Sequence, residues 1–162
     1  MAERRRRWYD RPFREVQRSA AYEADVLAWA NEQAALVRAG KFAQLDIEHV
    51  ADEEEDVGKS ERRELESRVA ALMAQLLKWR FQPANQSKNW ERTIREQRKR
   101  VVKKLKETPS LAPLLSDPAW IDGAWGDAVT AALAETGLDA LPENCPWSIV
   151  DQVLIDGWFR HA

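Results

Sequence analysis

Apolar residues recur every three or four positions along most of the chain, whereas the alternating pattern of a β-strand is missing. The clearest stripe consists of Leu65, Val69, Leu72, Leu76 and Trp79, with spacings of four, three, four and three residues. It predicts the buried face of a helix over residues 60–81. Met73 and Leu77 widen this stripe, so we expect the helix to contact more than one neighbour. The pattern indicates an all-α fold.

Helix-capping residues divide the rest of the chain into further helices. Gly40 should end the first helix, Asp46 is an N-cap candidate for the second, and Gly137 should end the fifth. The expected helices besides residues 60–81 cover residues 15–39, 46–58, 88–107 and 118–136, with a short one over residues 148–155. In the first, the residues expected to point inward are Tyr22, Val26, Trp29, Leu36 and Val37.

These elements predict one compact helical bundle of about five helices plus a short C-terminal helix. A chain of 162 residues has the length of one domain, which buries roughly 70% of its unfolded surface. We expect a basic N-terminal extension over residues 1–14, which carries arginines 4–7, and a single helical domain over residues 15–162. No internal repeat or low-complexity linker interrupts that domain.

The formal net charge of −2 conceals a strong segregation of charge along the chain. Residues 46–57 contain seven acids and no Lys or Arg, whereas residues 91–107 contain eight bases and three acids. On a helix, five of those bases share one narrow face, opposite an apolar face formed by Trp90, Ile94, Val101 and Leu105. We name this face the basic ridge; it consists of Arg92, Arg95, Lys99, Lys103 and Lys106.

The basic ridge is compatible with three interpretations. It is a solvated surface or faces acids of the same fold, it binds an acidic protein partner, or it follows the phosphates of a nucleic acid. The pI of about 5.8 and the absence of recognised nucleic-acid motifs make the last interpretation the less favoured one.

The acidic segment contains a weak candidate for a metal or general-base site. His49 and Glu53 are four residues apart and share a helix face, with Asp52 and Glu55 nearby. The set is incomplete as a divalent site, and the second histidine, His161, lies next to the end of the sequence. Glu54 falls on a stripe with apolar residues, so we expect it to be partly buried against an arginine or tryptophan.

Eight tryptophans are many for this length. Trp29, Trp79 and Trp90 fall on expected core faces. Trp120, Trp125, Trp147 and Trp158 lie in the less regular C-terminal third, where they either pack internally, which we favour, or form an aromatic surface for a partner.

Several function classes lose support because their motifs are missing. The sequence has no glycine-rich phosphate loop, Cys-x-x-Cys, His-Glu-x-x-His or nucleophile elbow, so we expect no cofactor and favour a protein without catalytic activity. Cys145 is the single cysteine and forms no intramolecular disulfide. With neither a secretory signal nor a membrane-length apolar segment, we expect a cytoplasmic protein that does not associate with membranes.

Short motifs in a fixed order resemble a known family. They include Tyr22-Glu23-Ala24-Asp25, Leu76-Leu77-Lys78-Trp79, Thr93-Ile94-Arg95-Glu96-Gln97-Arg98 and Cys145-Pro146-Trp147. Over residues 22–159 the chain is similar to the bacterial family of domains of unknown function numbered 29. The resemblance implies an all-helical bacterial domain and no established activity. The chain departs from the family pattern at Gln75, where a histidine is common, and at Glu54, where an aliphatic residue is common.

From these observations we expect a noncatalytic bacterial interaction module. It would bind a macromolecular partner through the basic ridge or the aromatic C-terminal region, and a second copy of the chain is one such partner. The first alternative is a metal-binding or enzymatic bundle centred on the acidic helix. The second is a nucleic-acid-binding protein that uses the basic ridge.

Overall fold

The computed structural model describes residues 20–138 and 141–160, which form helices, turns and connecting segments and contain no β-strand. The expected all-α fold is therefore confirmed. Contacts divide the chain into an N-terminal unit, Met1–Asp56, and a C-terminal unit, Val57–Ala162. The single domain over residues 15–162 stays a prediction, and the basic extension over residues 1–14 lies outside the described residues.

The N-terminal unit is built from short helices. They are α1 (Ala20–Ala24), α2 (Val26–Arg38), η1 (Phe42–Gln44) and the first turns of α3 (Ile47–Phe81). The helix expected over residues 15–39 is interrupted at Asp25, which has extended backbone angles and accepts a hydrogen bond from the Ala28 amide at 3.0 Å. Asp25 is thus the N-cap of α2, a role that Ser, Thr, Asp and Asn fill best.

Only part of the inward face expected for this segment is buried. Trp29 is 4% exposed, whereas Val26 and Val37 are 50% and 48% exposed. The prediction for these two valines is wrong. The buried residue next to Trp29 on its helix face is the polar Gln33, four positions later.

Helix α3 runs without interruption through Gly58, so the prediction of two separate helices over residues 46–58 and 60–81 is wrong. A glycine inside a helix costs only about 1 kcal/mol relative to alanine. Ser60 lies within the same helix and does not start a new one. The strong helix formers on both sides of Gly58 outweigh the two local breaking signals.

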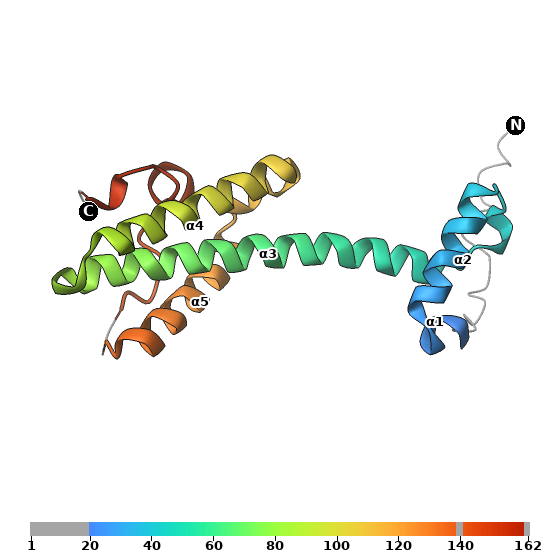
Figure 1. Ribbon diagram of the computed structural model, residues 1–162, viewed down its shortest axis with the longest axis horizontal. Helices are drawn as coiled ribbons and strands as arrows, with labels where there is room; N and C mark the ends of the chain where they lie inside the picture. The colour runs from blue at the N-terminus through green and yellow to red at the C-terminus, as the bar shows by residue number, and fades with distance from the viewer. Residues whose placement is uncertain (1–19, 139–140, 161–162) are drawn as a thin grey trace, which may run out of the picture. The chain divides into compact units, whose positions relative to one another are not determined.

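The core of the C-terminal unit forms around the second half of α3. Figure 1 shows α4 (Lys88–Glu107) and α5 (Pro118–Thr136) on different sides of this helix. Most of the predicted stripe is buried as expected, with Leu65, Val69 and Leu72 fully inaccessible and Leu76 nearly so, whereas Trp79 is half-buried. Met73 and Leu77 are also fully buried, which confirms that α3 contacts more than one neighbour.

Local capping signals fix the ends of α4 and α5. Ser87 accepts a hydrogen bond from the Trp90 amide, Asp117 accepts from the Ala119 amide, and Gly137 ends α5 with a φ of 66°. Short helical turns complete the unit: η2 (Pro83–Asn85), η3 (Pro109–Ser116), the π-helical turn η4 (Ile149–Val153) and η5 (Trp158–Arg160). Among the described residues, no helix has both the length and the apolar character that a membrane crossing requires.

Candidate functional site

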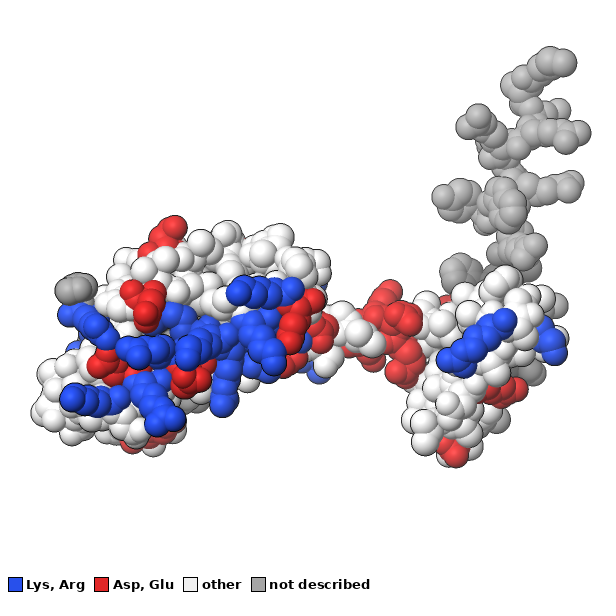
Figure 2. Space-filling view, turned by 45° about the horizontal axis from the view of Figure 1, so that its top comes forward, with Lys and Arg blue, Asp and Glu red and all other residues white. Residues whose placement is uncertain are grey.

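Helix α4 has one buried and one exposed face, as its sequence predicts. Ile94 and Val101 are fully buried, and Trp90 and Leu105 are half-buried. All members of the basic ridge are exposed: Arg92, Arg95, Lys99, Lys103 and Lys106. Figure 2 shows Lys and Arg side chains gathered in a band along the C-terminal unit. The two-faced helix is therefore confirmed.

Three members of the basic ridge form ion pairs with acids of α4 itself. The nitrogen-to-oxygen distances are 3.3 Å for Arg95–Glu91, 2.9 Å for Lys99–Glu96 and 3.6 Å for Lys103–Glu107. Lys99 also lowers the pKa of Glu96 by donating a hydrogen bond to it. Exposed pairs of this kind contribute little to stability. Because α4 carries nine bases and three acids, the ridge stays strongly positive.

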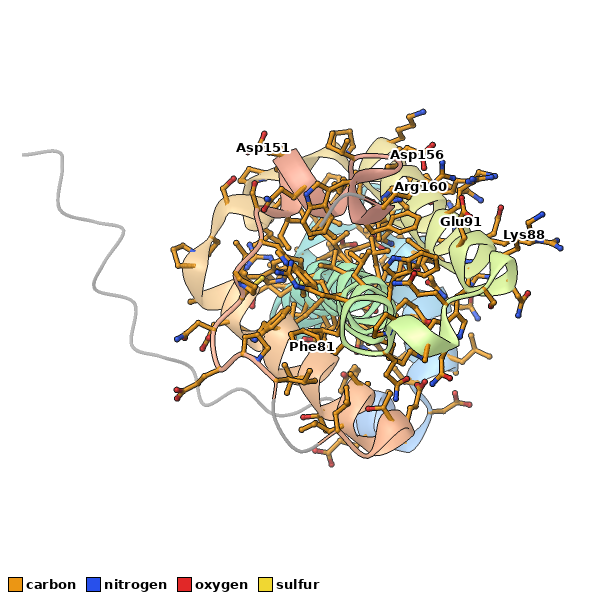
Figure 3. All side chains as sticks on the ribbon, turned by 90° about the vertical axis from the view of Figure 1, so that its left-hand side faces the viewer. Phe81, Lys88, Glu91, Asp151, Asp156 and Arg160 are labelled. Atoms are coloured by element: carbon orange, nitrogen blue, oxygen red, sulfur yellow. The ribbon has the colours of Figure 1, made fainter. Side chains whose placement is uncertain are left out.

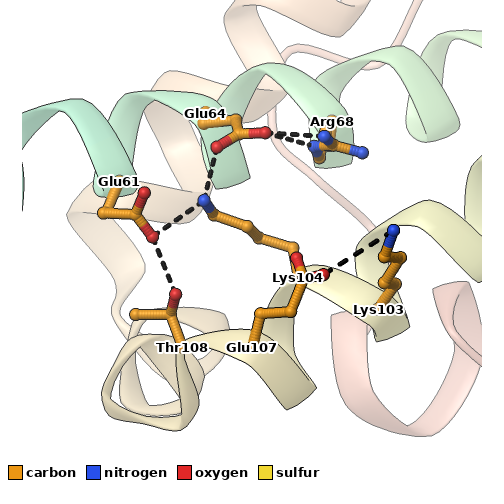
Figure 4. Close-up of polar contacts among 7 residues, drawn as sticks. All are labelled: Glu61, Glu64, Arg68, Lys103, Lys104, Glu107 and Thr108. Carbon is orange, nitrogen blue, oxygen red and sulfur yellow. Dashed lines mark hydrogen bonds and ion pairs between the residues drawn. The ribbon is translucent and has the colours of Figure 1, made fainter.

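Among the described residues of this unit, three further cations are buried, and helical periodicity did not predict their burial. Lys78 forms an ion pair with Glu135 of α5. Lys104 forms one with Glu64 and another with Glu61, whose carboxylate lies 2.8 Å away and also accepts a hydrogen bond from Thr108 at 2.7 Å (Figure 4). These hydrogen bonds raise the pKa of Lys104 and lower the pKa of both glutamates. Lys78 and Lys104 are therefore neutralised inside the fold.

Arg98 is the third buried cation, and its surroundings are different. Its Nε donates a hydrogen bond to the carbonyl oxygen of Val153 at 2.8 Å, and its guanidinium carbon lies 5.4 Å from the centre of the Phe159 ring. Its terminal nitrogens Nη1 and Nη2 are buried and make no hydrogen bond to any described residue. The nearest acid, Asp156, lies 3.6 Å from Nη1. Burial lowers the pKa of Arg98, and Asp156 opposes that effect.

The C-terminal segment holds this arrangement against α4. Besides the bond from Arg98 to Val153, Arg160 forms an ion pair with Glu91 near the start of α4. Figure 3 shows Arg160 and Glu91 side by side, with Asp156 on the same side of the unit. Ser148 is the N-cap of the π-helical turn η4 and accepts a hydrogen bond from the Asp151 amide at 3.2 Å.

A surface pocket of about 500 Å³ joins Arg98 to the basic ridge. We name it the Arg98 pocket; its lining residues are Arg95, Arg98, Lys99, Val102, Lys103, Lys106, Leu154 and Asp156. Four of the five ridge residues thus border one pocket, and Arg92 does not. Five cations and one acid converge there, together with two apolar side chains. This composition suits an anionic ligand that also carries an apolar group.

The candidate metal residues of the N-terminal unit are directed toward other partners. His49 Nδ1 lies 2.8 Å from Asp46 Oδ2, and the same oxygen accepts a hydrogen bond from the Trp29 indole at 3.2 Å. The Tyr22 hydroxyl donates to Glu53 at 2.5 Å, and its ring stacks on His49 with centres 4.2 Å apart. Asp52 and Glu55 are exposed.

No group of three or more His, Cys, Asp or Glu side chains is placed to hold a metal ion within the part of the chain that the structure describes. His161 lies outside that part. The structure does not bring His49, Asp52, Glu53 and Glu55 together as one site. It builds instead an aromatic and polar cluster from Tyr22, Trp29, Gln33, Asp46 and His49, in which Gln33 accepts a hydrogen bond from the Asp46 amide at 2.9 Å.

The family model for a domain of unknown function, DUF29, matches residues 21–159, which is most of the chain. The chain belongs to the DUF29 family. No curated protein and no solved structure matches it. Membership of DUF29 confirms the resemblance drawn from the sequence motifs and brings no known activity with it.

The expected burial of Glu54 in this DUF29 chain is wrong, because Glu54 is exposed. The apolar residues on the same stripe are Ile47, Val50 and Val57; Ile47 and Val57 are also exposed, at 65% and 61%, and Val50 is half-buried. The face of α3 that meets α1 and α2 carries His49 and Glu53 instead. The apolar spacing indicated the wrong face, since the contacts of this face are aromatic and polar rather than aliphatic.

The aromatic C-terminal third supplies core packing. Trp125 and Trp147 are 1% and 7% exposed, and edge-to-face contacts link Trp125, Trp147 and Trp158 in series. Trp120 is half-buried. Cys145 is half-buried too, and burial raises the pKa of its thiol, which disfavours the reactive thiolate. These side chains contribute to the hydrophobic core, as we favoured from the sequence.

Proposed function

We propose that this chain is a noncatalytic interaction module that binds an acidic segment of a partner protein through the basic ridge of α4. The observation that carries the proposal is the convergence of Arg95, Lys99 and Lys103, with Arg98 and Lys106, on one open pocket. Three ridge cations pair with glutamates of their own helix, of which Glu96 and Glu107 are exposed and Glu91 is half-buried. An acidic ligand replaces such pairs at little cost, because each is weak in water.

The composition of the pocket favours a protein segment over a nucleic acid. Val102 and Leu154 provide apolar surface beside the cations of the pocket, and a phosphate backbone would not use that surface. A segment that mixes acidic and apolar side chains suits both features. The overall charge of −2 also differs from that of a dedicated nucleic-acid-binding domain.

The other hypotheses for the function of this chain have less support. The aromatic C-terminal side chains are largely used in the core, and the acidic candidates of α3 do not converge. Nucleic-acid binding through the ridge is the second candidate, because the same cations favour any polyanion. We place the protein in the cytoplasm of a bacterium as part of the proposal, since the lone Cys145 suits a reducing compartment.

Fluorescence anisotropy with a labelled peptide of alternating Glu and Leu tests the proposal. The full chain is titrated at low salt, and labelled single-stranded and duplex DNA of similar length are titrated in parallel. One variant carries Arg95→Gln, Lys99→Gln and Lys103→Gln. Its matched control carries Arg62→Gln, Arg63→Gln and Arg80→Gln, which remove the same charge from exposed positions outside the pocket.

We expect the peptide to bind and its affinity to fall with added salt. The ridge variant should weaken it by about tenfold or more, and the control by much less. Equal losses in both variants would mean that only net charge matters, which contradicts the proposal. Preferential binding of DNA would favour the nucleic-acid reading, and binding of neither probe would end both.

A further inference from the structure

The buried cations of the C-terminal unit differ in how well their charge is matched. Lys78 and Lys104 each contact a carboxylate directly. Arg98 alone among the three leaves two terminal nitrogens without a hydrogen bond to any described residue. An unsatisfied buried donor destabilises the folded state, and more so when the group is charged. Such a group in a folded protein requires an explanation, and an absent ligand is one.

Arg98 is held in place by contacts that leave its buried terminal nitrogens without a hydrogen-bond partner among the described residues. Its Nε bond to the Val153 carbonyl and the Phe159 ring near its guanidinium fix the side chain. Nη1 lies 3.6 Å from Asp156, and both residues line the Arg98 pocket. A planar guanidinium presents parallel N–H donors that match two oxygens of a phosphate or carboxylate. The geometry is thus pre-organised for an oxyanion.

Asp156 occupies the position of a weakly bound substitute for such a ligand. At 3.6 Å its carboxylate makes an ion pair with Arg98 but no hydrogen bond. Its side chain is 76% exposed, so it can turn into water at little cost when another anion arrives. The other charged lining residues, Arg95, Lys99, Lys103 and Lys106, are all cations.

The excess of positive charge selects among oxyanions. One carboxylate requires a single cation, whereas a phosphate monoester carries close to two negative charges at neutral pH and three acceptor oxygens. Five cations and one acid line the pocket, so a dianion is matched better than a monoanion. Clusters of basic residues of this kind recognise phosphorylated segments in several unrelated folds.

We propose that the Arg98 pocket binds the phosphate group of a phosphorylated serine or threonine in the partner segment. The inference rests on the proposed function, because it names the group that enters the pocket when the ridge binds an acidic segment. Arg98 donates hydrogen bonds to two phosphate oxygens through Nη1 and Nη2, and the Asp156 side chain turns into solvent. Lys99 and Lys103 neutralise the remaining charge. Val102 and Leu154 contact the apolar residues beside the phosphorylated position.

The test compares two labelled peptides of acidic and apolar residues that differ only in a central phosphoserine or serine. Both are titrated into the full chain, with inorganic phosphate as competitor. Arg98→Lys keeps the positive charge but removes the parallel N–H donors of the guanidinium. Arg92→Lys is the matched control on the same helix outside the pocket. Asp156→Asn removes the substitute ligand and, being exposed, leaves the fold intact.

We expect the phosphoserine peptide to bind at least about tenfold more tightly than the serine peptide. Arg98→Lys should abolish most of that preference, Arg92→Lys should leave it, and Asp156→Asn should tighten phosphopeptide binding several-fold. Inorganic phosphate should compete only at far higher concentration. If Arg98→Lys lowers the thermal midpoint too far for titration, the test rests on Asp156→Asn. An unchanged affinity of the Asp156→Asn variant for the phosphopeptide then overturns the inference.

Two other outcomes separate this inference from the proposed function. Equal affinity for both peptides, with both weakened by the ridge variant, overturns the phosphate site and leaves the binding module in place. Binding of inorganic phosphate with no preference for the phosphopeptide also overturns it, because the partner is then not the source of the phosphate. Binding of neither peptide overturns both proposals.

Discussion

Arg98 of α4 donates a hydrogen bond to the main-chain oxygen of Val153, in the π-helical turn η4, across 55 positions of sequence. This bond ties the C-terminal segment to α4 beside the Arg98 pocket. It also satisfies a carbonyl group next to a fully buried side chain, since Val153 is inaccessible.

Replacing Arg98 by alanine should destabilise the chain by about 2 kcal/mol, because the Val153 carbonyl loses its donor and the side-chain packing against Phe159 is lost. Urea unfolding monitored by circular dichroism measures the change. Arg95→Ala removes an equally long cation from the exposed face of the same helix and should change the stability by less than about 0.5 kcal/mol. Equal effects of the two variants would show that the bond to Val153 contributes nothing.

Lys104 joins α4 to α3 through Glu61 and Glu64. Lys104→Gln should lower the thermal midpoint, because the two carboxylates then face each other without the buried cation between them. Lys103→Gln, one position earlier, breaks only an exposed pair with Glu107 and should leave the midpoint nearly unchanged. Differential scanning calorimetry of both variants checks this, and a larger loss for Lys103→Gln would refute the assignment.

Gly137 ends α5 in the left-handed conformation, with a φ of 66°. Gly137→Ala should therefore cost about 1 kcal/mol, since a Cβ is strained there even though no neighbouring atom lies within 4 Å. Gly126 lies inside the same helix in equally open space, and Gly126→Ala should stabilise by about 0.5–1 kcal/mol. The free energy of unfolding, measured by chemical denaturation, should thus fall for Gly137→Ala and rise for Gly126→Ala. The same sign for both would contradict this account of the helix end.

Asp46 makes the N-terminal unit sensitive to acid. Burial raises the pKa of Asp46, but the hydrogen bonds from His49 and Trp29 outweigh that effect and lower the pKa overall. Its folded pKa therefore lies below the unfolded value of about 3.9. The stabilisation is present above pH 4 or so and is lost as the pH falls through the folded pKa.

The Trp29 indole N–H resonance reports this titration, because that group donates to Asp46. The resonance should shift below about pH 4, where an ordinary aspartate has already begun to protonate. Asp46→Asn should remove the shift. An Asn variant with the same low-pH transition would assign the transition to another carboxyl group.

Much of the fold follows from short-range signals. Gly137 ends its helix as expected, and Ser87 and Asp117 cap the helices whose starts the sequence predicts, because a capping residue acts on the amide or carbonyl groups of the adjacent turn. The basic ridge follows from a period of 3.6 residues on a helix that starts and ends where its sequence predicts. Gly58 was expected to end a helix, but α3 continues through it. Helix continuity depends on the whole segment and not on one residue.

The burial of individual polar residues could not be read from periodicity. Arg98 and Lys104 belong to the same basic run as the ridge, yet they are 4% and 6% exposed. Each is buried because a distant segment supplies a partner: the Val153 carbonyl for one, Glu61 and Glu64 for the other. Glu54 and Glu53 show the same limitation, because only the position of Tyr22 decided which of them was contacted.

The sequence by itself determined the all-α class, the caps and extents of α4 and α5, the buried stripe of α3 and the exposed basic ridge. These properties depend on residues within a few turns of one another. Only the tertiary structure decided that four ridge cations meet a buried Arg98 in one pocket and that Asp156 lies beside it. That arrangement depends on how the C-terminal segment folds back on α4, because the groups that Arg98 contacts lie more than fifty residues away in the chain.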